Sequence, residues 1–416
     1  MIQNLSPLRS TPYRNLIAGR VVGTFGNAIA PITLSFALLD VTGSVSSLGL
    51  VVGARSLTNL LFLLVGGALA DRFSRRLILV GSSLASGATQ AAMAFALLLG
   101  FTSLPLLMTL SAASGFFSAF AFPASAALVS QTVPPGGLKP AVTLLRLGSN
   151  TATVAGASAG GLLVLIFPPA WGLAADALTM CLSGLCFARI RIDTTVVARK
   201  PPSSLLAELK QGWAEFISRS WVWVVVLSFC CINAGYAATM QVIGPVAADR
   251  TVGRAVWAYV IVAHTGGMFL GAVAGLRLDP KRPLAIGMLS VSALALLPIT
   301  LAMYPVTVAL FAAAIVGGMG LEQLGIFWET SLQRNIPADR LARIYSYDAL
   351  GSFAAIPLAQ VSAGPLVQLV GLNSALLGIG IIIVGASVCA AGNRSVRAVI
   401  HTTQRDEPKE ILDAPC

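Results

Sequence analysis

Twelve long apolar segments constrain the fold of this chain more than any other sequence feature. A helix needs about 20 mainly apolar residues to cross a bilayer. Only 10% of the 416 residues are charged, whereas soluble domains average about 25%. The sequence therefore predicts an all-α polytopic membrane protein with twelve transmembrane helices. The segments fall at 14–38, 46–70, 76–100, 105–130, 141–166, 170–190, 221–243, 255–277, 283–303, 306–332, 343–367 and 371–392.

Basic residues predict the orientation, because Lys and Arg are retained on the cytoplasmic side. The opposite connections carry only Arg250 and Arg254, so both termini are predicted to be cytoplasmic. The net charge of +11 then reflects topology and contact with lipid headgroups, and we expect no nucleic-acid partner. The basic clusters lie at the N-terminus, at 71–76, 133–140, 189–219, 277–282 and 334–343, and in the tail from Arg394.

Sequence signals for other classes of function are missing. Five of the six cysteines lie in apolar runs and none has metal-ligand spacing, so we expect neither a metal site nor a disulfide. The first residues show no cleavable signal peptide. No nucleotide-binding or catalytic motif is present, so we expect no enzyme and no cofactor.

The polar stretch between the sixth and seventh segments divides the chain into two halves. We expect an N-terminal six-helix bundle at 1–192, a cytoplasmic linker at 193–219, a C-terminal six-helix bundle at 220–393 and a tail at 394–416. The linker pattern SSLLAELKQGWAEFI fits an amphipathic helix, either on the membrane surface or in solvent.

The two halves repeat each other. Gly67-x-x-x-Asp71 recurs as Gly275-x-x-x-Asp279, an offset of 208 residues, and a second pair of matches after the fourth and tenth segments has an offset of 203. Transporters are often built from such repeats, with the substrate site at the repeat interface near the membrane midplane.

The connection GGALADRFSRR resembles the signature of the major facilitator superfamily, with Ser74 where the family usually has glycine. The resemblance implies that Asp71 contacts the N-terminal end of the eleventh helix when the halves close on the cytoplasmic side. The arginines either take part in gating or anchor the connection to headgroups. The signature residues are Gly67, Asp71, Arg72, Arg75 and Arg76.

Three further segments resemble the drug:proton antiporter branch that includes macrolide-efflux and enterobactin-exporter-like proteins. They are 41–51, the linker pattern and 328–352, while the antiporter pattern of the fifth helix is present only in part at 157–161. This resemblance implies proton-coupled efflux by a monomer in a bacterial inner membrane.

Ionisable residues within the membrane are costly and mark functional sites. Glu322 is the first candidate for the proton-coupling acid, with a hydrogen-bonded structural acid as the alternative. Glu329 follows it as a relay or ion-pair partner, and Asp348 suits a cytoplasmic gate network or proton coupling. Asp176, Arg55 and Asp40 suit either an outer gate or side chains that reach the membrane interface.

A polar stripe along the first helix predicts cavity-lining residues, or else contacts between helices. Its members Arg20, Thr24 and Asn27 share one face. His264 suits either a buried, hydrogen-bonded histidine or a second proton site. The other candidates for the substrate cavity are Phe120, Asn233, Tyr236 and Met240.

These observations favour a proton-coupled exporter of hydrophobic or amphipathic small molecules, such as an antibiotic, another secondary metabolite or a siderophore. An uncoupled facilitator or importer of a small metabolite is the alternative within transport. A receptor or lipid-handling membrane enzyme is the alternative from another class.

Overall fold

The computed structural model describes residues 7–72, 74–101, 103–133, 138–191, 213–275, 277–278, 280–336 and 338–400. Within these ranges, twelve helical segments are long and apolar enough to cross a membrane, which confirms the predicted number. Ser10 caps the first of them, because its hydroxyl accepts from the backbone N–H of Tyr13, and Gly43 ends it with a φ of 57°.

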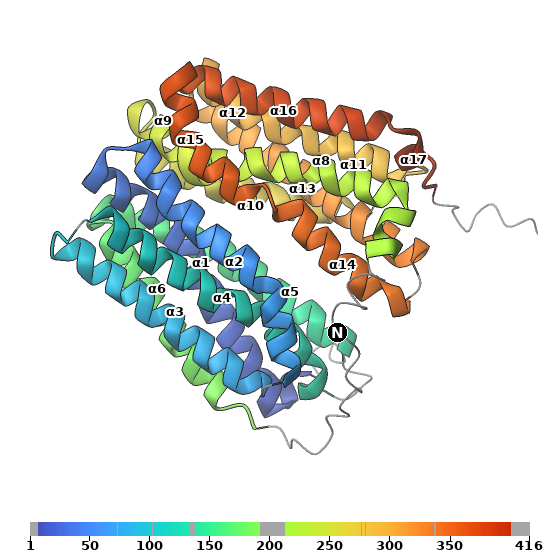
Figure 1. Ribbon diagram of the computed structural model, residues 1–416, viewed down its shortest axis with the longest axis horizontal. Coiled ribbons are helices and arrows are strands. Elements are labelled where there is room, and N and C mark those ends of the chain that lie inside the picture. The colour runs from blue at the N-terminus through green and yellow to red at the C-terminus, as the bar shows by residue number, and fades with distance from the viewer. Residues whose placement is uncertain are drawn as a thin grey trace, which may run out of the picture.

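The first six helices form one bundle, coloured blue to green in Figure 1. Helix α1 packs against α5 and α6, α2 packs against α4, and α3 lies between α4 and α6. The bounds are α1 Thr11–Thr42, α2 Val45–Arg72, α3 Arg75–Leu98, α4 Leu104–Thr132, α5 Leu138–Ile166 and α6 Ala170–Ala188.

The remaining helices form a second bundle, coloured yellow-green to red in Figure 1. Two of its spans contain a non-α turn, namely a π-turn between α8 and α9 and a 3₁₀ turn between α11 and α12. The elements are α8 Ser220–Ala238, η3 Thr239–Ile243, α9 Gly244–Arg250, α10 Arg254–Gly275, α11 Pro283–Val291, η4 Ser292–Ala295, α12 Leu296–Met303, α13 Thr307–Asn335, α14 Ala338–Phe353, α15 Ile356–Val370, α16 Leu372–Gly392 and α17 Arg394–Arg397.

Equivalent contacts between helices recur in the two bundles. Asn27 bonds Arg55 across α1 and α2, and Tyr236 bonds His264 across α8 and α10, with a separation of 28 residues in both pairs. Where α2 crosses α4, the Arg55 carbonyl lies against Gly115, and where α10 crosses α13, the His264 carbonyl lies against Gly318. The repeat in the sequence is therefore also a repeat in helix packing.

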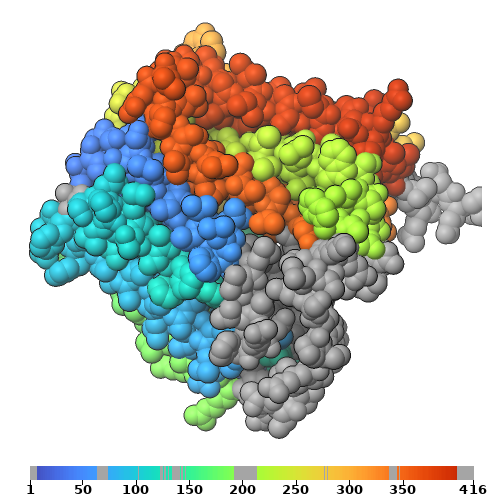
Figure 2. Space-filling view, viewed as in Figure 1, coloured from blue at the N-terminus to red at the C-terminus, as the bar shows by residue number. Residues whose placement is uncertain are grey.

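The bundles meet at the end where α1 ends and α2 begins, which the charge pattern predicts to face away from the cytoplasm. We call this end the outer end. In Figure 1 the bundles approach each other there, at the left, and diverge toward the right, where the N-terminus lies. The contacts between bundles join α2 to α15 and α5 to α10. Figure 2 shows the same junction as a continuous surface of side chains.

Candidate functional site

A central cavity of about 500 Å³ lies between the two bundles. Its walls come from α1, α2 and α4 on one side and from η3, α14 and α15 on the other. Half of its described lining residues are apolar and half carry polar side chains, a mixture that suits an organic ligand with apolar and polar parts. The described lining residues are Asn27, Pro31, Leu34, Ser35, Val52, Arg55, Ser56, Asn59, Leu60, Ser118, Gln241, Phe353, Ile356 and Pro357.

A second cavity, of about 260 Å³, lies inside the N-terminal bundle, and we call it the N-terminal cavity. It is lined largely by polar side chains from α1, α2, α3, α4 and α6. Asn27, Arg55 and Ser118 line both cavities. These three residues therefore mark the boundary between the substrate-sized space and the polar interior of the first bundle.

Arg55 is the charged side chain at this boundary. Its guanidinium donates to the Asn27 amide oxygen at 3.3 Å. Helix α2 starts at Val45 at the outer end, so a rise of 1.5 Å per residue places Arg55 about 15 Å into the membrane. A cation at that depth is costly unless a partner or water compensates it.

Asp176 lines the N-terminal cavity from α6 and is 0% exposed. Its Oδ2 accepts from Nε2 of Gln90 at 2.7 Å, while its Oδ1 has no hydrogen-bond partner among the described residues. The alternative in which this carboxylate reaches the membrane interface is therefore wrong. Gln90 lies on the serine-rich face of α3 that lines the N-terminal cavity. Its side-chain amide there partly compensates the buried carboxylate of Asp176.

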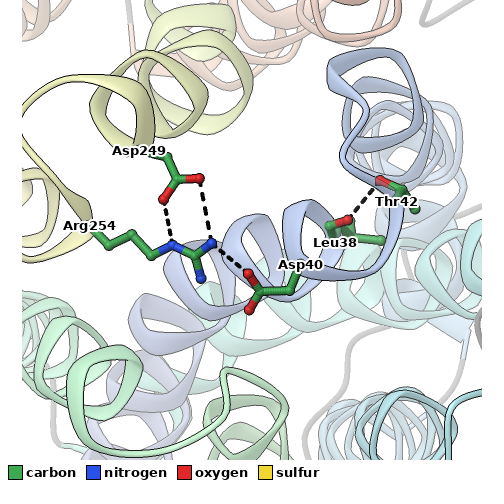
Figure 3. A network of polar contacts seen from close by, with 5 residues as sticks. All are labelled: Leu38, Asp40, Thr42, Asp249 and Arg254. Carbon is green, nitrogen blue, oxygen red and sulfur yellow. Dashed lines mark hydrogen bonds and ion pairs between the residues drawn. The ribbon is translucent and has the colours of Figure 1, made fainter.

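An ion-pair network closes the outer end (Figure 3). Arg254 at the start of α10 pairs with Asp40 of α1, with Nη2 and Oδ1 2.5 Å apart, and with Asp249 of α9, with Nε and Oδ1 2.6 Å apart. The guanidinium also lies 5.1 Å from the centroid of the Phe36 ring, a cation–π distance. The structure therefore favours an outer-gate role for Asp40.

Other contacts between the bundles surround this network, and together with it we call them the outer seal. The Ser35 hydroxyl donates to the Gln241 carbonyl at 3.1 Å, and the Gln368 amide donates to the Ser46 hydroxyl at 3.2 Å. Gly364 of α15 lies directly against the Ser46 backbone, so any larger side chain there would collide with α2. The outer seal therefore joins the two bundles at the outer end, next to the central cavity.

The structure places the predicted polar stripe of α1 on cavity walls. Arg20, Thr24 and Asn27 all line the N-terminal cavity, and Asn27 also faces the central one. Phe120 instead packs edge-on against Phe116, with ring centroids 5.0 Å apart, and lies outside both described linings.

The predicted cavity residues of the seventh span lie in contacts between helices and outside both described cavity linings. The Asn233 amide donates to the Ser352 carbonyl at 3.0 Å, which ties α8 to α14. The Tyr236 hydroxyl bonds Nε2 of His264 at 3.1 Å, and Met240 packs on the apolar core. Their neighbour Gln241 is the residue of this span that lines the central cavity.

The three candidate coupling acids lie in α13 and α14, and none belongs to the described lining of either cavity. Glu322 packs against Gly271 of α10. A Cβ added at Gly271 would lie 3.0 Å from the Cβ of Glu322. Glu322 is half-buried at this helix contact. The depth of Glu322 in the sequence does not reveal this contact with α10.

Glu329 and Asp348 lie together between α13 and α14, close enough for their charges to interact. The Tyr345 hydroxyl donates to Glu329 at 2.6 Å. Nε1 of Trp328 and the Ser352 hydroxyl donate to the two oxygens of Asp348, each at 2.9 Å. Both carboxylates therefore belong to one polar cluster within the C-terminal bundle.

The signature residues of the first cytoplasmic connection are described only in part. For Gly67, Asp71 and Arg72, only the helical backbone of α2 is described. The Arg76 guanidinium donates to the Ala188 carbonyl at the end of α6. Arg75 is half-buried at the start of α3. Within the described parts of the chain, no group of three His, Cys, Asp or Glu side chains could hold a metal ion.

The family assignment rests on most of the chain. Residues 16–359 match the model of the Major Facilitator Superfamily. The chain belongs to this superfamily. Its members are transporters rather than enzymes, so the protein is a multi-pass membrane transporter of the superfamily fold. No curated protein sequence matches the chain.

Solved structures with the same fold include several transporters. A bacterial homologue of the lysosomal transporter Spinster, inward-facing and unoccupied, has a TM-score of 0.72 at 14% identity, covering 95% of this chain and 98% of its own. The nucleoside transporter NupG has a TM-score of 0.73 at 13% identity, covering 91% and 97%. An inward-facing bacterial homologue of ferroportin has a TM-score of 0.71 at 14% identity, covering 92% and 99%.

Proposed function

We propose that this transporter exports hydrophobic or amphipathic small molecules by alternating access, in exchange for protons. The observation that supports this most is the central cavity between two pseudo-symmetric bundles, which the outer seal joins at the outer end. Such a cavity is accessible from one side at a time when the bundles rock against each other.

The lining of the central cavity supports the proposed class of cargo. Apolar surfaces from Leu34, Val52 and Phe353 face a few polar groups, including Asn59 and Gln241. This mixture suits a molecule with a large apolar part and few polar contacts. A volume of about 500 Å³ accommodates a drug-sized molecule.

A change between the inward-open and outward-open orientations requires contacts that form alternately at the two ends of the protein. The outer seal must open when the cavity turns outward, and a contact at the cytoplasmic end must then form. We propose that Asp71 supplies this second contact, at the N-terminal end of the helix that begins at Ala338, because free N–H groups and the helix dipole favour an anion there.

We further propose that proton binding in the C-terminal bundle drives the exchange, through Glu322, Glu329 or Asp348. The Glu329–Asp348 pair is the better supported site, because two neighbouring carboxylates lie there and each accepts hydrogen bonds from side chains of α13 and α14. Proton and cargo do not need a common site. Coupling requires only that each ligand prefers one orientation of the protein.

Efflux and a bacterial inner-membrane location are proposed from the resemblance of 41–51 and 328–352 to the drug:proton antiporter branch. A monomer is proposed on the same ground. Because the three acids lie outside the described cavity linings, an uncoupled facilitator or importer is the second candidate. The same experiment separates the two.

The test uses proteoliposomes that contain a trapped pH dye, with candidate antibiotics and siderophores added one at a time. The variants are Glu322→Gln, Glu329→Gln and Asp348→Asn. A matched control is Glu215→Gln, since Glu215 pairs with Arg219 before α8 begins. We expect cargo-triggered proton movement in the wild type and the control, and its loss in at least one of the three variants. Cargo movement without proton movement would contradict coupling and favour the facilitator.

A further inference from the structure

We propose that the transported molecule carries an anionic group, in the simplest case a carboxylate, that binds Arg55 while its apolar part occupies the central cavity. This inference rests on the proposed transport through that cavity, and it specifies the class of cargo. The observations that support it are the pairing of Arg55, the charges around it and the walls of the cavity.

The pairing of Arg55 is incomplete for a guanidinium at mid-depth. A guanidinium has five N–H donors, and within the described parts of the chain Arg55 makes one hydrogen bond, to the neutral amide of Asn27. Arg254 provides the comparison within the same chain. It lies nearer the aqueous face and still contacts two carboxylates, Asp40 and Asp249. The arginine in the costlier environment therefore has the weaker partner.

The other charges around Arg55 come from α1 and α6. Among the described residues that line the two cavities, the charged ones are Arg20, Arg55 and Asp176. Asp176 is close enough to influence Arg55 electrostatically, but the two form no ion pair, and Asp176 bonds Gln90 instead. The described lining of the central cavity itself contains one guanidinium and no carboxylate, so a positive charge faces the cargo there.

A carboxylate matches this site in geometry and charge. It can accept two parallel N–H bonds from one guanidinium, and such charge-assisted pairs are stronger than neutral hydrogen bonds. A cationic cargo would face Arg55 in a central cavity whose described lining contains no acid. The repulsion would be strong, because charges in a water-poor cavity are poorly screened.

The apolar part of the cargo has a separate place. Arg55 lies in the wall of the central cavity, whose other walls include Pro31, Leu34, Ile356 and Pro357. A molecule whose carboxylate reaches Arg55 would bury its apolar body against these residues and against both bundles. The proposed cargo is therefore an amphipathic organic anion.

The test measures binding to the purified full-length protein at neutral pH. The probes are a size series of amphipathic carboxylates (benzoate, 1-naphthaleneacetate and cholate), each paired with its neutral amide of nearly the same shape. We expect at least one carboxylate to bind about tenfold or more tightly than its amide, as one charge-assisted contact allows. If no carboxylate binds more tightly than its amide, the proposal is overturned.

Variants assign the preference to Arg55. Arg55→Gln should abolish the difference between carboxylate and amide, Arg55→Lys should retain part of it, and the exposed control Arg250→Gln should leave it intact. Asp176→Asn should tighten carboxylate binding several-fold, because it removes a negative charge near the bound anion. A preference that persists in Arg55→Gln would overturn the assignment. Should Arg55→Gln fail to fold, the wild-type comparison and Asp176→Asn still decide, and an unchanged or weaker affinity in Asp176→Asn counts against the proposal.

This proposal and the proposed function can fail separately. Anion binding that depends on Arg55, without cargo-triggered proton movement, would retain the anion site and exclude proton coupling. Proton-coupled efflux of neutral or cationic compounds that is unaffected by Arg55→Gln would retain the function and overturn the anion site.

Discussion

Asp40 at the end of α1 and Arg254 at the start of α10 form a direct ion pair between the two bundles, with oxygen and nitrogen 2.5 Å apart. Asp249 of the second bundle holds the same guanidinium, so Arg254 connects carboxylates from both halves (Figure 3). Opening of the outer end must separate Asp40 from Arg254. The stability of this contact therefore helps to set the balance between the two orientations.

Arg254→Gln should shift the protein toward the outward-open orientation. The substitution removes the cation and leaves Asp40 and Asp249 facing each other. Because these side chains are partly exposed, we expect a shift of only about 1 kcal/mol, or several-fold in population. Electron–electron distance measurements between spin labels at Ser46 and Gln368 report it as a larger fraction of long distances. Arg250→Gln is the matched control, and an equal effect there would remove the special role of Arg254.

Gly364→Leu should prevent the outer seal from closing. A Cβ at this position would overlap the Ser46 backbone. That backbone belongs to the helix α2 and cannot shift locally without distorting it. The same spin-label pair should then report long distances in most molecules. Gly378→Leu in α16 is the control, because a Cβ there meets open space. Closed distances in Gly364→Leu would show that α2 and α15 do not need this close approach.

Tyr236→Phe should lower stability without changing the pH dependence of transport. The hydroxyl bonds His264, whose Nδ1 also contacts the Ala314 carbonyl, so the pair supports packing within the C-terminal bundle. We expect a loss of about 1–2 kcal/mol, because a buried ring nitrogen loses its partner. Thermal unfolding in detergent measures it. A shifted pH profile with unchanged stability would instead indicate that His264 is a second proton site.

Gln90→Leu should destabilise the N-terminal bundle strongly. It removes the hydrogen bond that the buried Asp176 carboxylate accepts, at a cost of about 3 kcal/mol. Asp176→Asn in the same background should recover part of the loss, because a neutral amide is less costly to bury than a charge. Thermal unfolding of the two single variants and the double variant measures the coupling. Additive losses would show that Gln90 and Asp176 do not stabilise each other.

Most of the fold could be predicted from the sequence, because twelve apolar runs and alternating basic connections leave few alternatives for a chain in a bilayer. The repeat was also visible in the motifs at Gly67 and Gly275, whereas the equivalent helix contacts at Gly115 and Gly318 became apparent only in the structure. The spacing placed Arg20, Thr24 and Asn27 on one face of α1, because one face of a helix follows directly from spacing. All three line the N-terminal cavity, only Asn27 also lines the central one, and contact with cargo stays a prediction.

The direction of single side chains was harder to predict. Glu322 lies near mid-depth in sequence, yet its Cβ packs against Gly271 of α10 and the residue lies outside the described cavity linings. Arg55 and Asp176 were visible as charges within helices, but their place depends on the arrangement of five helices around one cavity. The serine-rich face of α3, which ends in Gln90, was the available signal for a polar interior.

Cysteine accessibility at Asn59, in the wall of the central cavity, tests alternating access most directly. The six native cysteines are first replaced, and a membrane-impermeant maleimide is applied to oriented vesicles from either side. We predict labelling of Asn59→Cys from the cytoplasmic side only, and labelling from the outer side once Arg254→Gln or Gly364→Leu is added. Labelling of the parent Asn59→Cys protein from the outer side, or simultaneously from both sides, would contradict a cavity that the outer seal closes.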